Sequence, residues 1–227
     1  MNRSDPGDMD STRAAELAEQ IAQRAEVLRR RIDAVARGPV EVVAVSKGHQ
    51  AVVAAAAIEA GFEALGENYA QELRDKAPLV SGAEWHFIGR LQSNKVRLIA
   101  ESVSVWQSLD RDSAIDAVAK RAPGAKVMIQ VDLAGLEGRG GCGRAEVPRL
   151  VERSVEAGLS VVGLMGVGPP GDPEDSRPGF RWLAREAAAL DLPEVSMGMS
   201  ADLEVALSEG STMVRVGSAL VGPRPPR

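Results

Sequence analysis

The chain has 227 residues, of which 44% are hydrophobic, 26% charged and 3% aromatic. This length suits one large core, and a single α/β barrel fits it better than two ordinary domains. The net charge of −5 argues against a nucleic-acid binder that relies on broad attraction to phosphates.

Three features of the sequence predict a cytoplasmic protein without a membrane partner. The polar start MNRSDPGDMD lacks the pattern of a signal peptide. No apolar run approaches the roughly 18–20 residues that a membrane span needs. The single cysteine, Cys142, excludes an intramolecular disulfide and favours a reducing compartment.

The start of the chain predicts a tail followed by a long helix. Residues 1–11 show no periodicity and are expected to form a flexible tail, with residues 12–227 forming a single domain. From Ser11, apolar side chains recur every three or four residues over about 25 residues, as in an amphipathic helix. These side chains are Leu17, Ile21, Ala25, Leu28, Ile32 and Val35, and Gly38-Pro39 ends the helix.

Beyond this helix, strands and helices alternate. The expected strands are 40–46, 62–67, 84–89, 103–109, 125–133, 159–167, 193–198 and 211–217. The expected helices are 50–60, 69–77, 92–101, 111–121, 146–158, 180–190 and 200–209. Most strands are continuous apolar runs, which is typical of parallel strands covered on both faces. The pattern predicts a (β/α)8 TIM-type barrel with an extra N-terminal helix.

An open, doubly wound α/β sheet is the alternative to the barrel. No G-x-G-x-x-G follows the first strand, which counts against a dinucleotide-binding sheet.

In such a barrel the functional site lies at the carboxyl ends of the strands. The first strand ends in Ser46-Lys47. A partly desolvated lysine at this position has a lowered pKa and can attack a carbonyl group. Alternatively, its ammonium group simply extends into solvent.

The loops after the seventh and eighth strands carry Gly198-Met199-Ser200 and Gly217-Ser218. These two loops form the recurrent phosphate site of such barrels, because small residues let backbone N–H groups approach an anion. Ser200 is equally suited to cap the next helix. The occurrence of small residues in both loops favours a phosphate site.

Three further polar residues have two interpretations each. Arg215 stands between apolar neighbours, so it points to the opposite face and needs a partner. That partner is either an Asp or Glu on a neighbouring strand or a ligand. His86 faces either the barrel mouth or the core, and Asn68 either binds a ligand or holds a turn.

The sequence predicts no metal site and no catalytic thiol. The two histidines, His49 and His86, cannot form an ordinary structural zinc site with one cysteine, and no H-E-x-x-H occurs. Cys142 is expected in a flexible loop, GRGGCGR, with no histidine nearby in sequence.

Five segments together resemble the pyridoxal phosphate homeostasis protein family. They are AVSK (44–47), GENYAQEL (66–73), WHFIGRLQSNK (85–95), GLMGV (163–167) and SMGMSADLEVALSEGSTMVRVGSALVG (196–222). Ser218 stands where threonine is common in that family, and Gly166 where alanine is common. The ending VGPRPPR lacks the aromatic residues often found there.

The resemblance implies a barrel similar to the N-terminal domain of bacterial alanine racemase, with pyridoxal 5′-phosphate (PLP) as the cofactor. It implies that Lys47 is the reactive residue and forms a Schiff base with PLP. It also implies that Arg215 lies at the pyridine nitrogen. The other implied cofactor-binding residues are Ser200, Gly217 and Ser218 around the phosphate, and Asn68, His86 and Met199 nearby.

The function implied by the resemblance is to carry or buffer PLP in vitamin B6, amino-acid and keto-acid homeostasis, without robust turnover. PLP-requiring apo-enzymes are the candidate recipients, and a monomer is expected. The alternatives are a PLP-dependent amino-acid racemase or lyase, and a cofactor-free Schiff-base aldolase. Racemases of this class set a second acid/base, usually a tyrosine from another domain, opposite the lysine. The only tyrosine here is Tyr69 and no second domain is expected, which favours a carrier.

Overall fold

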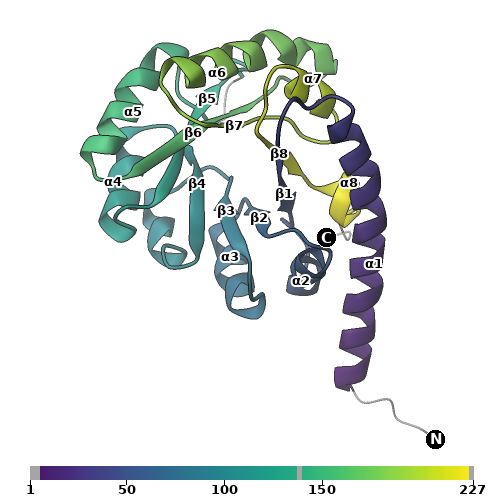
Figure 1. The fold of residues 1–227 in the computed structure, drawn as a ribbon. Helices are drawn as coiled ribbons and strands as arrows, with labels where there is room; N and C mark the ends of the chain where they lie inside the picture. The colour runs from purple at the N-terminus through teal and green to yellow at the C-terminus, as the bar shows by residue number, and fades with distance from the viewer. Residues whose placement is uncertain (1–5, 137–139, 225–227) are drawn as a thin grey trace, which may run out of the picture.

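The computed structural model describes residues 6–136 and 140–224, with side chains from residue 14 onward. Within these residues eight parallel strands close into a barrel, with β8 paired to β1 (Figure 1). The predicted TIM-type barrel is therefore confirmed, and the open sheet is excluded. The strands are β1 (Glu41–Val45), β2 (Ala64–Glu67), β3 (Glu84–Phe87), β4 (Val103–Leu109), β5 (Lys126–Asp132), β6 (Ser160–Val167), β7 (Glu194–Ser196) and β8 (Met213–Val216).

Helices and helical turns connect successive strands over the outside of the barrel (Figure 1). The α-helices after β1 are α2 (Ala51–Glu59), α3 (Ala70–Lys76), α4 (Asp112–Arg121), α5 (Val147–Glu156), α6 (Arg177–Ala189), α7 (Leu203–Ser208) and α8 (Ser218–Val221). Short 3-10 helices are η1 (Ala77–Leu79), η2 (Ser93–Leu98), η3 (Arg144–Glu146) and η4 (Pro173–Ser176). Among the described helices, none is both long and apolar enough to cross a membrane.

The connection between β3 and β4 differs from the α-helix predicted at 92–101. It is the 3-10 helix η2, closed by bonds such as that from Lys95 N to Gln92 O. Side chains three residues apart lie above one another in a 3-10 helix. This geometry directs both Val96 and Ile99 into the core, where they are fully buried.

The first helix, α1 (Pro6–Asp33), begins before the predicted start at Ser11. Residues 6–11 are therefore helical and not part of a tail, while residues 1–5 lie outside the described part of the chain. A proline is compatible with the first turn of a helix, since the N–H that it lacks has no partner within the helix there. Gly38-Pro39 lies beyond the helix end.

The predicted apolar stripe of α1 fixes this helix to the barrel. Ile21, Ala25, Leu28 and Ile32 are buried. The helix packs against α2, α7 and α8, and Figure 1 shows it running along the outside of the barrel beside α8. Arg31 adds an ion pair to Glu204 on α7, with 2.6 Å between Nε and Oε1. The helix therefore covers the side of the barrel where β8 meets β1.

The inside of the barrel is a packed core in three levels. One inward-facing side chain from most strands forms an apolar middle level of Val43, Ala64, Val105, Met128, Met165 and Met213. Residues two positions earlier on the strands, such as Glu41 and Glu84, lie toward the amino ends. Residues two positions later, such as Val45 and Arg215, lie toward the carboxyl ends.

We predict that Leu28→Ala on α1 lowers the free energy of unfolding by about 2–4 kcal/mol, because it leaves a cavity against the barrel. The matched control is Val27→Ala on the same helix, where the valine is 51% exposed. This control should change the free energy by no more than about 0.5 kcal/mol. Urea denaturation of both variants measures the difference, and equal effects would show that α1 is not docked.

Candidate functional site

A cavity of about 630 Å³ opens at the carboxyl ends of the strands. Its volume is in the range of small-molecule sites. All the predicted site residues except His86 line it: Lys47, Asn68, Met199, Ser200, Arg215, Gly217 and Ser218. Other lining residues include Arg90, Gln130, Asp132, Gly140 and Arg224, which the sequence analysis did not single out.

Lys47 is the second residue after the end of β1 and is half-buried. Its burial lowers the pKa of the side-chain amine, and the positive charges of Arg224 and Arg215 lower it further. Glu67 acts in the opposite direction. The net lowering increases the fraction of neutral amine near pH 7, which is the form that attacks a carbonyl carbon.

A buried ion pair fixes the backbone on the amino side of Lys47. Lys76 Nζ lies 2.6 Å from Glu67 Oε1 and donates to Ser46 O at 2.9 Å. The Ser46 hydroxyl donates to the same oxygen of Glu67 at 2.7 Å. Lys76 and Glu67 are buried, so both charges depend on these contacts.

The residue on the other side of Lys47 is fixed as well. Gly48 N donates to Glu72 Oε2 at 2.7 Å, and Lys76 Nζ lies 3.1 Å from that oxygen. Through Lys76, α3 therefore holds both neighbours of Lys47. The sequence analysis missed this network, although Glu67 at the end of an apolar strand was a signal that a buried charge needs a partner.

Arg215 is buried and makes hydrogen bonds to β6 and β7. An ion pair with an Asp or Glu was one of the two predicted alternatives, and the described residues do not form it. Its Nη1 donates to Ser196 O at 2.7 Å and to Ser196 Oγ at 2.6 Å, and its Nη2 donates to Gly166 O at 2.7 Å. Within the described residues it forms no salt bridge. Burial lowers the pKa of Arg215 to about 10, and Asp202 opposes that effect. The guanidinium therefore stays charged at neutral pH.

His86 lies below the cavity and does not line it. Its Nδ1 is 2.7 Å from Gln107 Nε2, and Gln107 Oε1 accepts from the Ser196 hydroxyl at 2.7 Å. Ile88, two residues later on the inward-facing side, lines the cavity instead. Burial lowers the pKa of His86 to about 4, so its imidazole is neutral. The structure therefore does not bring His86 to the predicted cofactor site.

The two small-residue loops do meet at the cavity, as predicted. Ser200 is not a helix cap, because α7 begins at Leu203 and Asp202 precedes it. Gly198 has φ +93°, and a Cβ there would lie 2.5 Å from the Cβ of Ala206, so the close approach of this loop to α7 requires glycine. Gly217 and Ser218 form the start of α8.

Cys142 is buried and forms a β-bridge with Val131. The prediction that it lies in a flexible loop is therefore wrong. Its N–H donates to Gln130 O at 2.9 Å, and its carbonyl accepts from Asp132 N at 2.9 Å. Burial raises the pKa of the Cys142 thiol to about 12. The thiol is therefore protonated at neutral pH and unsuited to nucleophilic catalysis.

Comparison with known proteins places the chain in a family. Residues 18–225 match the family described as alanine racemase, N-terminal domain. A pyridoxal phosphate homeostasis protein of Pseudomonas aeruginosa is 36% identical over 220 residues, covering 92% of this chain and 96% of that protein. The chain belongs to the pyridoxal phosphate homeostasis protein family. The predicted family is thereby confirmed.

Solved structures of another family member agree with this assignment. PipY of Synechococcus elongatus PCC7942 without PLP is 30% identical, with a TM-score of 0.80, and covers 89% of this chain and 100% of that one. The structure of PipY with PLP bound is 31% identical, with a TM-score of 0.75 and the same coverage.

We predict that Lys76→Met destabilises the fold by about 3–5 kcal/mol, because it leaves the buried carboxylate of Glu67 without its cation. The matched control is Arg74→Met on the same helix, where the arginine is half-exposed and pairs only with its neighbour Asp75. That change should cost about 1 kcal/mol or less. Chemical denaturation distinguishes the two, and a similar small cost for both would reject the buried pair as an anchor.

We also predict a shift in the pH dependence of amine reactivity. Arg224→Gln removes a positive charge that lowers the pKa of Lys47, so this pKa should rise and less free amine should be present at pH 7. The rate of Schiff-base formation with PLP should then reach its half-maximum at a higher pH. Arg90→Gln is the matched control, since Arg90 lines the same cavity but is not among the groups that lower the pKa of Lys47. Equal profiles for wild type and Arg224→Gln would contradict the prediction.

Proposed function

We propose that this chain binds PLP covalently through the amine of Lys47, as a Schiff base, and that it carries or buffers the cofactor in vitamin B6 homeostasis. The observation that carries the proposal is that a half-buried amine with a lowered pKa shares one cavity with two small-residue loops. Those loops supply Ser200, Gly217 and Ser218.

The residues of the cavity fit the chemical groups of PLP. When bound, PLP supplies an aldehyde carbon that a primary amine attacks. The hydroxyls of Ser200 and Ser218, together with nearby backbone N–H groups, are suited to a phosphate. Asn68 Oδ1 is buried and has no hydrogen-bond partner among the described residues. It is an acceptor that a ligand hydroxyl would satisfy.

Arg215 favours carriage of the cofactor over turnover. Three hydrogen bonds hold its guanidinium at the floor of the cavity, where it keeps its positive charge. A fixed cation disfavours protonation of a ring nitrogen that it faces. An unprotonated ring is a weaker electron sink, so it stabilises carbanions poorly.

The position of Tyr69 also supports a carrier. A racemase needs a second acid/base across from its lysine. Tyr69 is 49% exposed and lines a neighbouring hollow with Gln92 and Lys95, and it does not line the Lys47 cavity. We further propose a cytoplasmic monomer that delivers PLP to PLP-requiring apo-enzymes.

Borohydride trapping tests the proposal. Purified protein mixed with PLP should gain a visible absorbance band that borohydride removes, and peptide mass mapping should place the reduced adduct on Lys47. Lys47→Arg keeps the positive charge but should lose the band, whereas Lys95→Arg, outside the cavity, should behave as wild type. A full band in folded Lys47→Arg would overturn the proposal.

The same samples distinguish a carrier from an enzyme. Incubation of the PLP-loaded protein with a panel of amino acids should give no racemisation or elimination above free PLP. Turnover of one amino acid that is lost in Lys47→Arg would replace the carrier with the racemase or lyase alternative.

A further inference from the structure

A second group of polar side chains lies toward the amino ends of the strands, with His86 at the level of the apolar middle residues and two glutamates beneath it. Glu41 begins β1, Glu84 begins β3, and His86 follows two residues later on the same face of β3. One potential ligand atom from each of these three residues lies within 4.8 Å of the other two. The group is separate from the Lys47 cavity, whose lining includes none of the three.

His86 brings a free ring nitrogen to this group. The histidine is 1% exposed, its Nδ1 is engaged by Gln107, and its Nε2 is buried without a hydrogen-bond partner among the residues that the structure describes. A buried polar atom without a partner costs free energy. The nitrogen therefore calls for a ligand from outside the chain.

The electrostatic surroundings favour a cation as that ligand. The carboxylates of Glu194 and Glu63 add negative charge close to Glu41 and Glu84, while Lys126 brings a positive charge near Glu41 and His86. Several carboxylates in one place repel each other, and a bound cation would relieve that repulsion.

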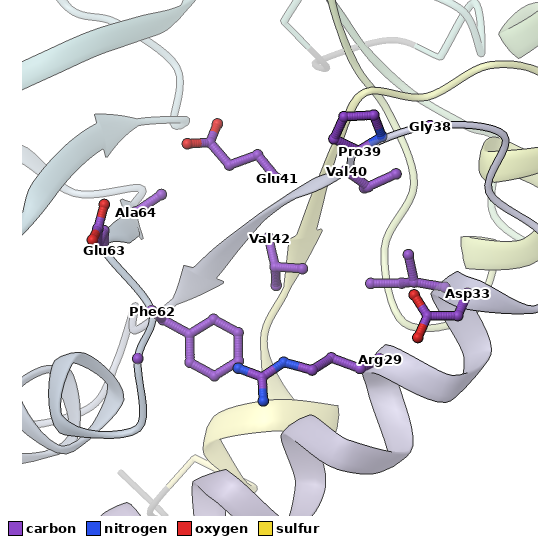
Figure 2. A pocket seen from close by; sticks show the side chains of 12 residues that line it. Arg29, Asp33, Gly38, Pro39, Val40, Glu41, Val42, Phe62, Glu63 and Ala64 are labelled. Carbon is purple, nitrogen blue, oxygen red and sulfur yellow. The ribbon is translucent and has the colours of Figure 1, made fainter.

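The two glutamates of the group are exposed to solvent, whereas His86 is buried behind them. Glu41 also borders a hollow of about 380 Å³ between α1 and the starts of β1 and β2. Figure 2 shows the Glu41 side chain on the opposite side of β1 from Val42, which points toward Arg29 and Phe62. Both Glu41 and Glu84 are exposed, so their carboxylates can adjust their positions.

We propose that Glu41, Glu84 and His86 form a binding site for a divalent transition-metal ion at the amino end of the barrel, with Zn²⁺ as the best fit. One imidazole nitrogen and two carboxylate oxygens suit Zn²⁺, whereas Mg²⁺ and Ca²⁺ prefer oxygen ligands alone. Bonds of about 2.1 Å place the ligand atoms of one ion about 3–4 Å apart. The observed separations therefore need only a small closing movement of the two glutamates.

The proton on His86 must move for the ion to bind. Arg215 donates to Ser196, Ser196 donates to Gln107, and Gln107 Nε2 donates to Nδ1, so the imidazole proton rests on Nε2. Coordination through Nε2 requires the proton on Nδ1 and a reversed Gln107 amide whose oxygen accepts it. The Ser196 hydroxyl has two acceptor lone pairs, so it can accept from both Arg215 and the reversed amide.

The proposed ion would have a structural role. It would join β1 to β3 across β2 at the end of the barrel where residues contribute to stability and not to chemistry. An ion that binds only the folded state stabilises it by mass action. The proposal does not depend on PLP binding.

Equilibrium dialysis of the full, tag-free chain against Zn²⁺, after removal of metal with a chelator, tests the site. Wild type should retain one Zn²⁺ per chain and unfold at a higher temperature with Zn²⁺ than without it. Glu84→Gln, a change at an exposed position that leaves the fold intact, should weaken retention about tenfold or more and lose the thermal shift. Glu63→Gln is the matched control, because it removes a nearby negative charge outside the ligand set.

Three results would overturn the proposal. The first is a folded wild type that retains no Zn²⁺. The second is retention by Glu84→Gln equal to that of wild type, which would place the ion elsewhere. An equal loss in Glu84→Gln and Glu63→Gln would show diffuse attraction by negative charge and no coordination. Retention in Glu63→Gln together with loss in Glu84→Gln is the result that supports the site.

Discussion

The site depends first on the buried ion pair between Lys76 and Glu67. Removing two charges from water is costly, and this cost is recovered only if both charges are fully engaged. Here Lys76 and Glu67 Oε1 also engage Ser46 O and Oγ, and through Glu72 the contacts extend to Gly48 N, so they fix the backbone on either side of Lys47. Glu67 Oε2 has no partner among the described residues. The lysine at the barrel mouth therefore has a defined direction although its own side chain is only half-buried. Burial at that fixed position, and then the charges of Arg224 and Arg215, lower the pKa of its amine.

A chain of four polar side chains crosses the otherwise apolar interior. Arg215, Ser196, Gln107 and His86 are each buried, and each is hydrogen-bonded to the next. Because a guanidinium can only donate, the Ser196 hydroxyl accepts from Arg215; here it donates in turn to Gln107 Oε1, and Gln107 Nε2 donates to His86 Nδ1. Such a chain is stable only when all its members are satisfied. Among the residues that the structure describes, the atom at the end of this chain, His86 Nε2, has no hydrogen-bond partner.

The sequence predicted the barrel well because every βα unit buries its residues in the same way. Each strand is covered on both faces and each helix on one, so the same pattern of apolar residues recurs in each unit. It predicted less well where local geometry competes with that pattern. The connection after β3 is the 3-10 helix η2 in place of the predicted α-helix, and the apolar spacing of Val96 and Ile99 is compatible with both. The helix α1 extended to Pro6 because an N-terminal proline does not prevent a helix from starting.

Among the site residues, those on the loops after β7 and β8 were predicted from their small size, but the depth of His86 in the barrel was not predicted. A two-residue step along an inward-facing strand moves a side chain from the cavity to the level beneath it, and no sequence pattern reports the level at which a strand begins.

The two ends of the barrel are joined through this chain of hydrogen bonds. At the carboxyl ends, Arg215 borders the cavity that contains Lys47, and at the amino ends His86 faces Glu41 and Glu84. Between them the described hydrogen bonds run from Arg215 through Ser196 and Gln107 to His86, among the buried apolar side chains of the middle level such as Val43, Met128 and Met165. If the Gln107 amide reverses, Ser196 must change from donor to acceptor while Arg215 continues to donate to it. The guanidinium therefore keeps its place and its charge in both arrangements, and the cavity at the mouth is insulated from what binds below.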